Sequence, residues 1–241
     1  MPGLEIGMPA AGIALLAGLV HGYSGFGGGL LLVPLLSLLV GPVDAVAVTM
    51  VAAVFGQVPV IRDAARDAEW RECWPFLIGA AAATPLGMML LVGGDPVLVR
   101  RAVGACTLAA AGVIWAGWAY RGARGPVTGG VFGAVAGLVG GATGQGGPLA
   151  VAYFMAAPFE ARRQRGSIIA VVGGLVVIVL AALAIGGAIS VGSVALGVWV
   201  GVPYLASVWA GARLFALLPK PHYRRATLGL LAVAGIAALV G

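Results

Sequence analysis

The segment His21-Gly-Tyr-Ser-Gly-Phe-Gly-Gly-Gly29 interrupts the first apolar run of the chain, and Pro34 follows it. Each glycine in a helix interior costs about 1 kcal/mol relative to alanine, so this segment disfavours a continuous helix. At membrane depth, irregular backbone is tolerated only where protein or a polar cavity surrounds it. The segment therefore predicts a broken helix.

A second copy of this pattern begins 119 residues later. Residues 17–30 and 136–149 are identical at nine of fourteen positions, and Ser24 aligns with Thr143. Both copies interrupt a long apolar run near the start of one half of the chain. We therefore divide the sequence into two related units, residues 1–120 and residues 121–241.

The composition is that of an integral membrane protein. Of the 241 residues, 61% are hydrophobic and 9% are charged, and the mean hydropathy is +1.07. Too few polar residues are present to cover a water-facing surface. The net charge of +6 comes largely from arginines in short loops, where they set membrane orientation rather than bind nucleic acid. Cys73 and Cys106 form neither a CxxC motif nor a disulfide framework.

Each unit contains one interrupted apolar run followed by three continuous ones. In the first unit these cover 10–40, with a break at 22–29, and then 43–61, 74–92 and 102–120; the second unit has 128–157, with a break at 140–147, and then 167–185, 191–217 and 226–240. As helices, the two halves of the first interrupted run, 10–21 and 28–40, are each about 18–20 Å long. That length passes the middle of a bilayer and stops. We predict an all-α polytopic membrane protein.

The loop charges favour a re-entrant hairpin at each break, that is, a segment that enters the membrane and returns. With hairpins, twelve of the fourteen basic residues lie on one side and only Arg100 and Arg101 on the other. If each interrupted run crossed the membrane, the division would be nine against five. The positive-inside rule prefers the first division and puts both termini outside, in the periplasm. Three crossings per unit also make the units inverted repeats, as in many secondary transporters.

The breaks are predicted to bind an anion. The second half of a broken helix begins with unpaired N–H groups and the positive end of the helix dipole. Two such ends are expected near the midplane at Gly28 and Gly147, and Pro148 suits the first turn of a helix. The candidate substrate-binding residues are His21, Ser24, Gly25, Gly27, Gly28 and Gly29 in the first break and Thr143, Gly144, Gln145, Gly146 and Gly147 in the second.

These residues also have structural interpretations. The glycines suit close helix packing of the GxxxG kind, although packing needs glycines four apart rather than in runs. His21 is a candidate for binding the anion, for carrying a proton, or for a hydrogen bond to a nearby carbonyl. Gln57 is interpreted as a residue that hydrogen-bonds between helices. Tyr204 and Ser207 are interpreted as packing residues.

The sequence indicates neither an enzyme nor a cofactor site. No Asp or Glu lies deep in an apolar run, which argues against a cation pump with buried carboxylates. No HExxH motif or nucleotide-binding loop is present, and neither histidine has a catalytic or metal-binding partner in sequence. We therefore expect no enzymatic activity, no cofactor and no bound metal.

Several of these motifs resemble those of the TauE/SafE-type sulfite and sulfonate exporter family. The resemblance covers essentially the whole chain and is carried by Gly-Phe-Gly-Gly-Gly29 with Pro34, by Gly-Gln-Gly-Gly147, by the Trp70 loop and by Gly-Ala-Arg-Leu214. It implies a transporter of the bacterial cytoplasmic (inner) membrane. Its implied substrate is sulfite, a sulfonate or a related small organic or sulfur-containing anion.

The predicted partners are a small anion and the lipid bilayer. Protons are a candidate coupling ion through His21, and a homo-oligomer is a candidate assembly. Two other functions fit parts of the sequence. A membrane scaffold or assembly subunit would use the breaks only for packing and would show no ligand-dependent stabilisation. A permease for a metal ion or another solute is the second alternative. The sequence lacks the buried carboxylates and thiols that a cation pathway uses, which argues against a cation permease.

Overall fold

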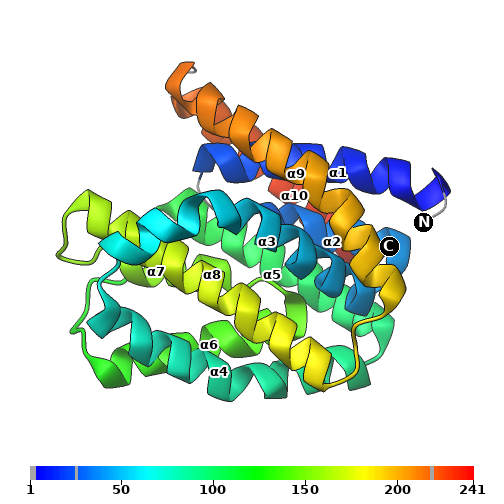
Figure 1. Cartoon of the computed structure of the whole chain (residues 1–241). Helices are drawn as coiled ribbons and strands as arrows, with labels where there is room; N and C mark the ends of the chain where they lie inside the picture. Colours follow the sequence, from blue (N-terminus) through cyan, green and yellow to red (C-terminus); the bar gives the residue numbers. More distant parts are fainter. Residues whose placement is uncertain (1–3, 25–26, 218–219) are drawn as a thin grey trace.

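In the computed structural model, which describes residues 4–24, 27–217 and 220–241, every regular element is a helix (Figure 1). The first five helices are α1 (Leu4–Ser24), α2 (Gly28–Val40), α3 (Pro42–Asp67), α4 (Trp70–Gly93) and α5 (Pro96–Ala116). The second five are α6 (Pro126–Thr143), α7 (Gly147–Phe154), α8 (Ala161–Ile185), α9 (Val191–Leu217) and α10 (Lys220–Val240).

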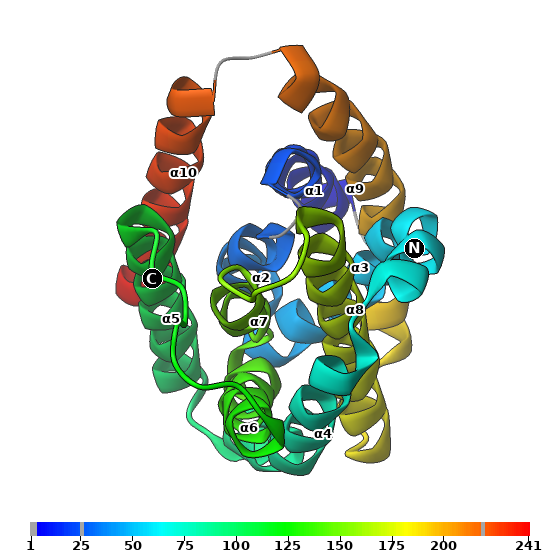
Figure 2. The ribbon, with the colours of Figure 1, turned by 90° about the vertical axis from the view of Figure 1, so that its left-hand side faces the viewer.

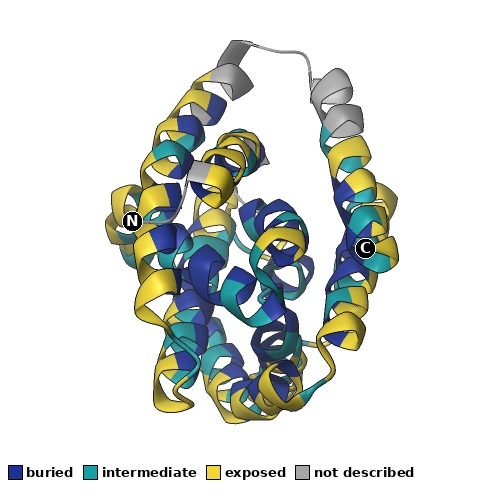
Figure 3. Ribbon diagram, turned by 90° about the vertical axis from the view of Figure 1, so that its right-hand side faces the viewer, coloured by how far each residue is buried: buried dark blue, intermediate teal, exposed yellow. Residues whose placement is uncertain are grey.

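Seven of the described helices are long and apolar enough to cross a membrane, namely α1, α3, α4, α5, α6, α8 and α9. Two shorter helical stretches, α2 and residues 227–240 of α10, are also apolar. Large apolar side chains such as Met89, Trp115 and Val191 are exposed, and exposed residues run along the outer faces of the helices (Figure 3). A lipid-facing surface has this character. The prediction of a multi-span helical membrane protein is confirmed.

The helices that flank the breaks differ in length from the prediction. α1 begins at Leu4 rather than near Ala10, and its 21 residues span about 31 Å. The apolar run used for the prediction begins only after Glu5 and Pro9, so it leaves out the first turns of α1. α7 has only eight residues, because Pro158 prevents the segment from continuing as a helix.

The first helix of each half packs in parallel against the fourth helix of the other half (Figures 1 and 2). α1 thus lies along α9, and α6 lies along α4. The contacts that fix these directions are Gly7 with Trp199 and Leu19 with Gly211 between α1 and α9, and Phe76 with Gly133 and Ala80 with Gly137 between α4 and α6. Both seams depend on glycines, which let two helix backbones approach closely.

Helices at equivalent positions in the two halves pack against each other in antiparallel pairs. These pairs are α3 with α8 and α5 with α10. The contacts that fix the directions are Ala64 with Gly166 and Ile61 with Gly173 in the first pair, and Gly104 with Leu239 and Leu108 with Gly235 in the second.

At each break the chain turns back on itself (Figure 1). α1 and α2 run in opposite directions, as do α6 and α7. In the second hairpin, the backbone N–H of Tyr120, just before α6, donates to the carbonyl of Ala152 near the end of α7 (2.8 Å). The entry and exit of this hairpin therefore lie at the same end of the molecule.

We call that end, where the connections 68–69, 117–125 and 155–160 gather, the basic end. Two ion pairs tie α3 and the turn after it to the start of α8: Arg162 Nε lies 2.7 Å from Asp67, and Arg163 Nη1 lies 2.9 Å from Glu69. Both ends of the described chain and the turns after α4 and α8 lie at the opposite end (Figure 1).

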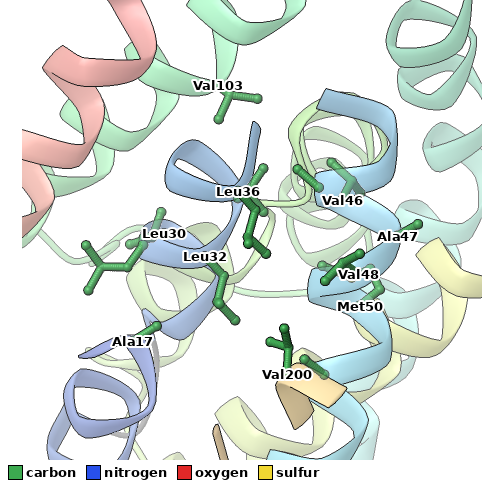
Figure 4. Close-up of a cluster of buried hydrophobic side chains, with 14 of the residues drawn as sticks. Ala17, Leu30, Leu32, Leu36, Val46, Ala47, Val48, Met50, Val103 and Val200 are labelled. Carbon is green, nitrogen blue, oxygen red and sulfur yellow. The ribbon is translucent and has the colours of Figure 1, made fainter. Parts of the chain in front are cut away.

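The core is built around α2. This helix is apolar on all sides, and such a helix is stable only when it is surrounded. Leu30, Leu32 and Leu36 are fully buried; Leu36 lies beside Val46 of α3, and Leu30 lies on the opposite side of α2 (Figure 4). The buried core therefore holds the start of α2 in place at the first break.

Candidate functional site

Both glycine-rich breaks line one cavity of about 80 Å³. The predicted site residues on its wall are His21, Gly27, Gly28, Gly29, Gly144, Gln145, Gly146 and Gly147. The breaks also approach each other, since a Cβ atom at Gly29 would lie 3.6 Å from the carbonyl oxygen of Gly144. Segments 119 residues apart in the sequence thus form a single site.

The first break ends in backbone donors that α2 itself does not use. Gly27 has φ of +94°, a conformation that other residues rarely adopt, and α2 begins at the next residue. The N–H groups of Gly28 and Gly29 have no partner within the helix, whereas that of Leu30 donates to the carbonyl of Gly27 (3.1 Å). The Tyr204 hydroxyl packs so close to Gly28 that any side chain there would overlap it.

The second break is poorer in backbone donors. Gly144, with φ of +70°, ends α6. α7 begins at Gly147, whose N–H has no partner within the helix. Pro148 has no N–H, and the N–H of Leu149 donates to the carbonyl of Gly146 (3.3 Å). Only the Gly147 N–H is therefore available at the start of α7.

Gln145 lies between α6 and α7 and is held by α5. Its Nε2 donates to Oγ1 of Thr107 (2.9 Å), which in turn donates to the carbonyl of Val103 (2.9 Å). Gln145 is only 4% exposed, and its Oε1 has no hydrogen-bond partner among the described residues. An amide oxygen left unpaired in a buried position costs about 1–3 kcal/mol, so a ligand or water in the cavity is the natural partner.

Three further wall residues come from helices that the sequence did not connect with the breaks. Thr49 and Gln57 of α3 line the cavity, and Oγ1 of Thr49 and Oε1 of Gln57 are buried with no partner among the described residues. Tyr204 of α9 also lines it. A polar residue within an apolar run was the only available signal for Thr49 and Gln57. Ser207, in contrast, bonds to the carbonyl of Tyr204 (3.0 Å) and serves packing, as expected.

The other polar residues predicted at the breaks differ in what they contact. The His21 ring, at the end of α1, lies 5.8 Å from the Tyr204 ring, centroid to centroid. The Thr143 hydroxyl donates to the carbonyl of its own helix at Val139 (2.8 Å), and Thr143 is not among the wall residues. The Ser24 side chain and Gly25 lie outside the described residues.

None of the described residues on the cavity wall carries a permanent charge, and His21 becomes positive only when it binds a proton. None of the described residues that line the cavity is Asp, Glu, Lys or Arg, and the titratable ones are His21 and Tyr204. The α8 side is apolar, with Val172, Val176 and Val179. The wall is therefore made of neutral donors and acceptors on one side and hydrocarbon on the other.

The helices long enough to span a membrane surround a small cavity that both glycine-rich breaks line, an arrangement that suits a transmembrane transport protein. The family model described as Sulfite exporter TauE/SafE matches residues 10–238, so the chain belongs to this family. Its members are transporters and not enzymes, in line with the expectation from sequence. No curated protein and no solved structure matches the chain.

Proposed function

We propose that this protein is a secondary transporter that exports sulfite, a sulfonate or a related small anion across the bacterial cytoplasmic membrane. The substrate binds between the two helix breaks near the membrane midplane. The observation that carries this proposal is the convergence of both breaks on one cavity. Packing alone gives no reason for two helix starts to share an internal space.

The arrangement of the helices supports inverted repeats with re-entrant hairpins. A two-fold axis perpendicular to the helices makes equivalent helices antiparallel, as α3 and α8 are, and as α5 and α10 are. The same axis relates the α1–α9 seam to the α6–α4 seam. Each half is then one hairpin and three crossings, with α1 and α6 turning back at the breaks although they are long enough to span, and the substrate lies at the interface between the repeats.

The cavity suits a small anion in both charge and size. Helix N-termini favour negative charge, and none of the described wall residues is a carboxylate that would repel it. A single water needs about 10–15 Å³ of such space, so 80 Å³ holds on the order of half a dozen water-sized groups. An oxyanion of four or five heavy atoms fits this space.

The charge distribution supports outward transport. The basic end faces the cytoplasm by the positive-inside rule, which puts both termini in the periplasm. A negative cell interior then drives a monovalent anion outward by about 2.3 kcal/mol per 100 mV. His21, on the cavity wall, is the residue through which protons would couple to transport.

Ligand binding by the purified protein tests the proposal directly. We expect sulfite or a sulfonate to raise the melting temperature, because a ligand at 100 times its Kd adds about 2.7 kcal/mol of stability. The panel includes sulfite, sulfate, thiosulfate, sulfoacetate, taurine and acetate. In proteoliposomes loaded with the stabilising anion, an inside-negative potential should accelerate its efflux.

The Gly112→Ala variant is the matched control. A Cβ atom at Gly112, in α5, meets nothing within 4 Å, and the residue is not on the cavity wall. It should bind and transport like the wild type. If no anion stabilises the protein and no potential-driven efflux occurs, the proposal is wrong and the scaffold hypothesis gains support.

A further inference from the structure

The orientation of the Gln145 amide is fixed by its neighbour. The Thr107 hydroxyl has one proton, and its short contact with the Val103 carbonyl (2.9 Å) uses that proton. Thr107 can therefore only accept from Gln145, whose Nε2 lies 2.9 Å away. If the amide were turned over, two acceptor oxygens would face each other. Oε1 of Gln145 is thus held as an acceptor, and Gln145 is one of the residues that line the cavity.

The site consequently has a donor end and an acceptor end. The α2 start supplies the N–H groups of Gly28 and Gly29, and the unpartnered Thr49 hydroxyl, only 1% exposed, lies on the same wall. The α7 start supplies the N–H of Gly147, and Gln145, whose Oε1 is unpartnered, lies two residues before it and also lines the cavity. A bare oxyanion satisfies the donors but leaves the Gln145 oxygen without a partner.

We propose that the cavity selects a singly protonated oxyanion, with its charged oxygens toward α2 and its proton donated to Oε1 of Gln145. Gln145 then determines specificity, and Thr107 is a positioning residue that acts through it. This inference rests on the proposed function and names the form of the anion that the site takes. Sulfite fits it as the hydrogensulfite ion, whereas sulfate near neutral pH does not.

Titratable groups around the cavity do not supply the same selectivity. His21 of α1 and Tyr204 of α9 are the titratable residues on the described wall, and α2, α3, α6, α7 and α8 contribute none. A protonated His21 would attract any monoanion, with or without a proton of its own. Matched monoanions compared at one pH therefore separate the two effects.

The test measures the affinity of the full-length protein for two pairs of monoanions at one pH near neutrality. Hydrogencarbonate and nitrate have the same charge and number of heavy atoms, and only the first can donate. Hydrogensulfite and methanesulfonate, which has one heavy atom more, form a second pair of equal charge in which only the first can donate. We expect the donor-bearing member to bind roughly 5- to 100-fold more tightly, the factor that corresponds to leaving a buried acceptor unpaired.

Two variants test whether Gln145 and Thr107 cause the selectivity. Gln145→Leu should bring both affinity ratios close to one. Thr107→Val keeps the side-chain shape and lies outside the cavity wall, and it should lower the ratios because the Gln145 amide can then turn and donate. It also serves as an independent test if Gln145→Leu does not fold. Gly112→Ala should keep the wild-type ratios.

The outcomes separate this inference from the proposed function. Equal affinities within each pair in the wild type would overturn the inference but leave anion binding intact. Ratios that stay unchanged in Gln145→Leu and Thr107→Val would also overturn it. If an amino-sulfonate such as taurine bound more tightly than hydrogensulfite, Oε1 of Gln145 would accept a hydrogen bond from the ammonium group of the ligand instead. That result would also overturn the inference. Failure of every anion to bind would overturn the proposed function together with the inference.

Discussion

Adjacent glycines of the second break differ in the room around them. A Cβ atom at Gly146 would lie 2.5 Å from the carbonyl oxygen of Ala136, so a side chain there disturbs the hairpin itself. At Gly147 the nearest atom is Cγ2 of Val172, 3.9 Å away, and both residues line the cavity. Substitution at Gly147 is therefore the sharper probe of the site.

We expect Gly147→Ala to fold normally and to bind the anion about tenfold more weakly or worse. The added methyl group projects toward Val172 and narrows a small cavity, where one such group changes binding by a factor of ten or more. Titration of the anion into both proteins, with the melting temperature of the free protein as a check on folding, measures the effect. Wild-type affinity in Gly147→Ala would exclude this cavity as the binding site.

At the residue scale, the sequence predicted the glycine backbone that lines the cavity better than the side chains that line it. The breaks were visible because runs of glycine, such as Gly144 to Gly147, are incompatible with a helix. Thr49 and Tyr204 were missed because only the packing of α3 and α9 against the breaks brings them to the cavity. Thr143 was predicted as a donor, but its hydroxyl bonds to its own helix, as threonine commonly does.

At the element scale, the seam between α4 and α6 is a backbone-to-backbone contact. Gly133, Gly137 and Gly141, four residues apart on α6, each lie directly against the α4 backbone. Spacing of this kind is the packing pattern that was considered as an alternative for the breaks. Glycine thus has two separate roles here: regular spacing within α6 brings helices together, and the run after α6 interrupts the chain.

We expect Gly137→Ala to lower stability by about 1–3 kcal/mol, the usual cost of overpacking a close contact. The new methyl group would overlap the carbonyl of Ala80, which belongs to the backbone and cannot move aside. Thermal unfolding in detergent without ligand measures this effect, and Gly112→Ala is the control at an open position. Equal melting temperatures for the two variants would contradict the described seam.

The helices themselves were largely predictable, since apolar runs separated by Gly, Pro and Arg reveal spans directly. The start of α1 was not, because Glu5 and Pro9 look like loop residues in a search for apolar runs. The partners of each helix were also unpredictable. Contacts such as Gly211 with Leu19 join residues almost 200 positions apart, and no local pattern encodes them.

At the scale of the whole molecule, the two hairpins make a prediction about topology. In a variant with Cys73 and Cys106 replaced, a cysteine at exposed Arg66 or Ala123 should react only with reagents that enter the cytoplasm. A cysteine at exposed Gly93, where a side chain meets nothing within 4 Å, should react from outside. Asp95 is less suitable because its carboxylate accepts from the N–H groups of Val97 and Leu98 and caps α5.

The hairpin model requires a cysteine at exposed Glu160, after α7, to label from the same side as Ala123, before α6. Opposite labelling at Ala123 and Glu160 would mean that α6 and α7 together cross the membrane. Such a result would leave the cavity in place but would remove the inverted symmetry on which the proposed orientation rests.

The pairing of α1 with α9 sets the order in which a ribosome can complete this protein. α1 is finished at Ser24, but its partner is finished only at Leu217. At 5–20 residues per second, translation takes about 10–40 s to cover that distance. α4 and α6 are completed within about 3–10 s of each other by the same rate. The nascent chain therefore assembles from its middle, and during elongation the glycine-bearing face of α1 must be shielded by lipid or by the insertion machinery.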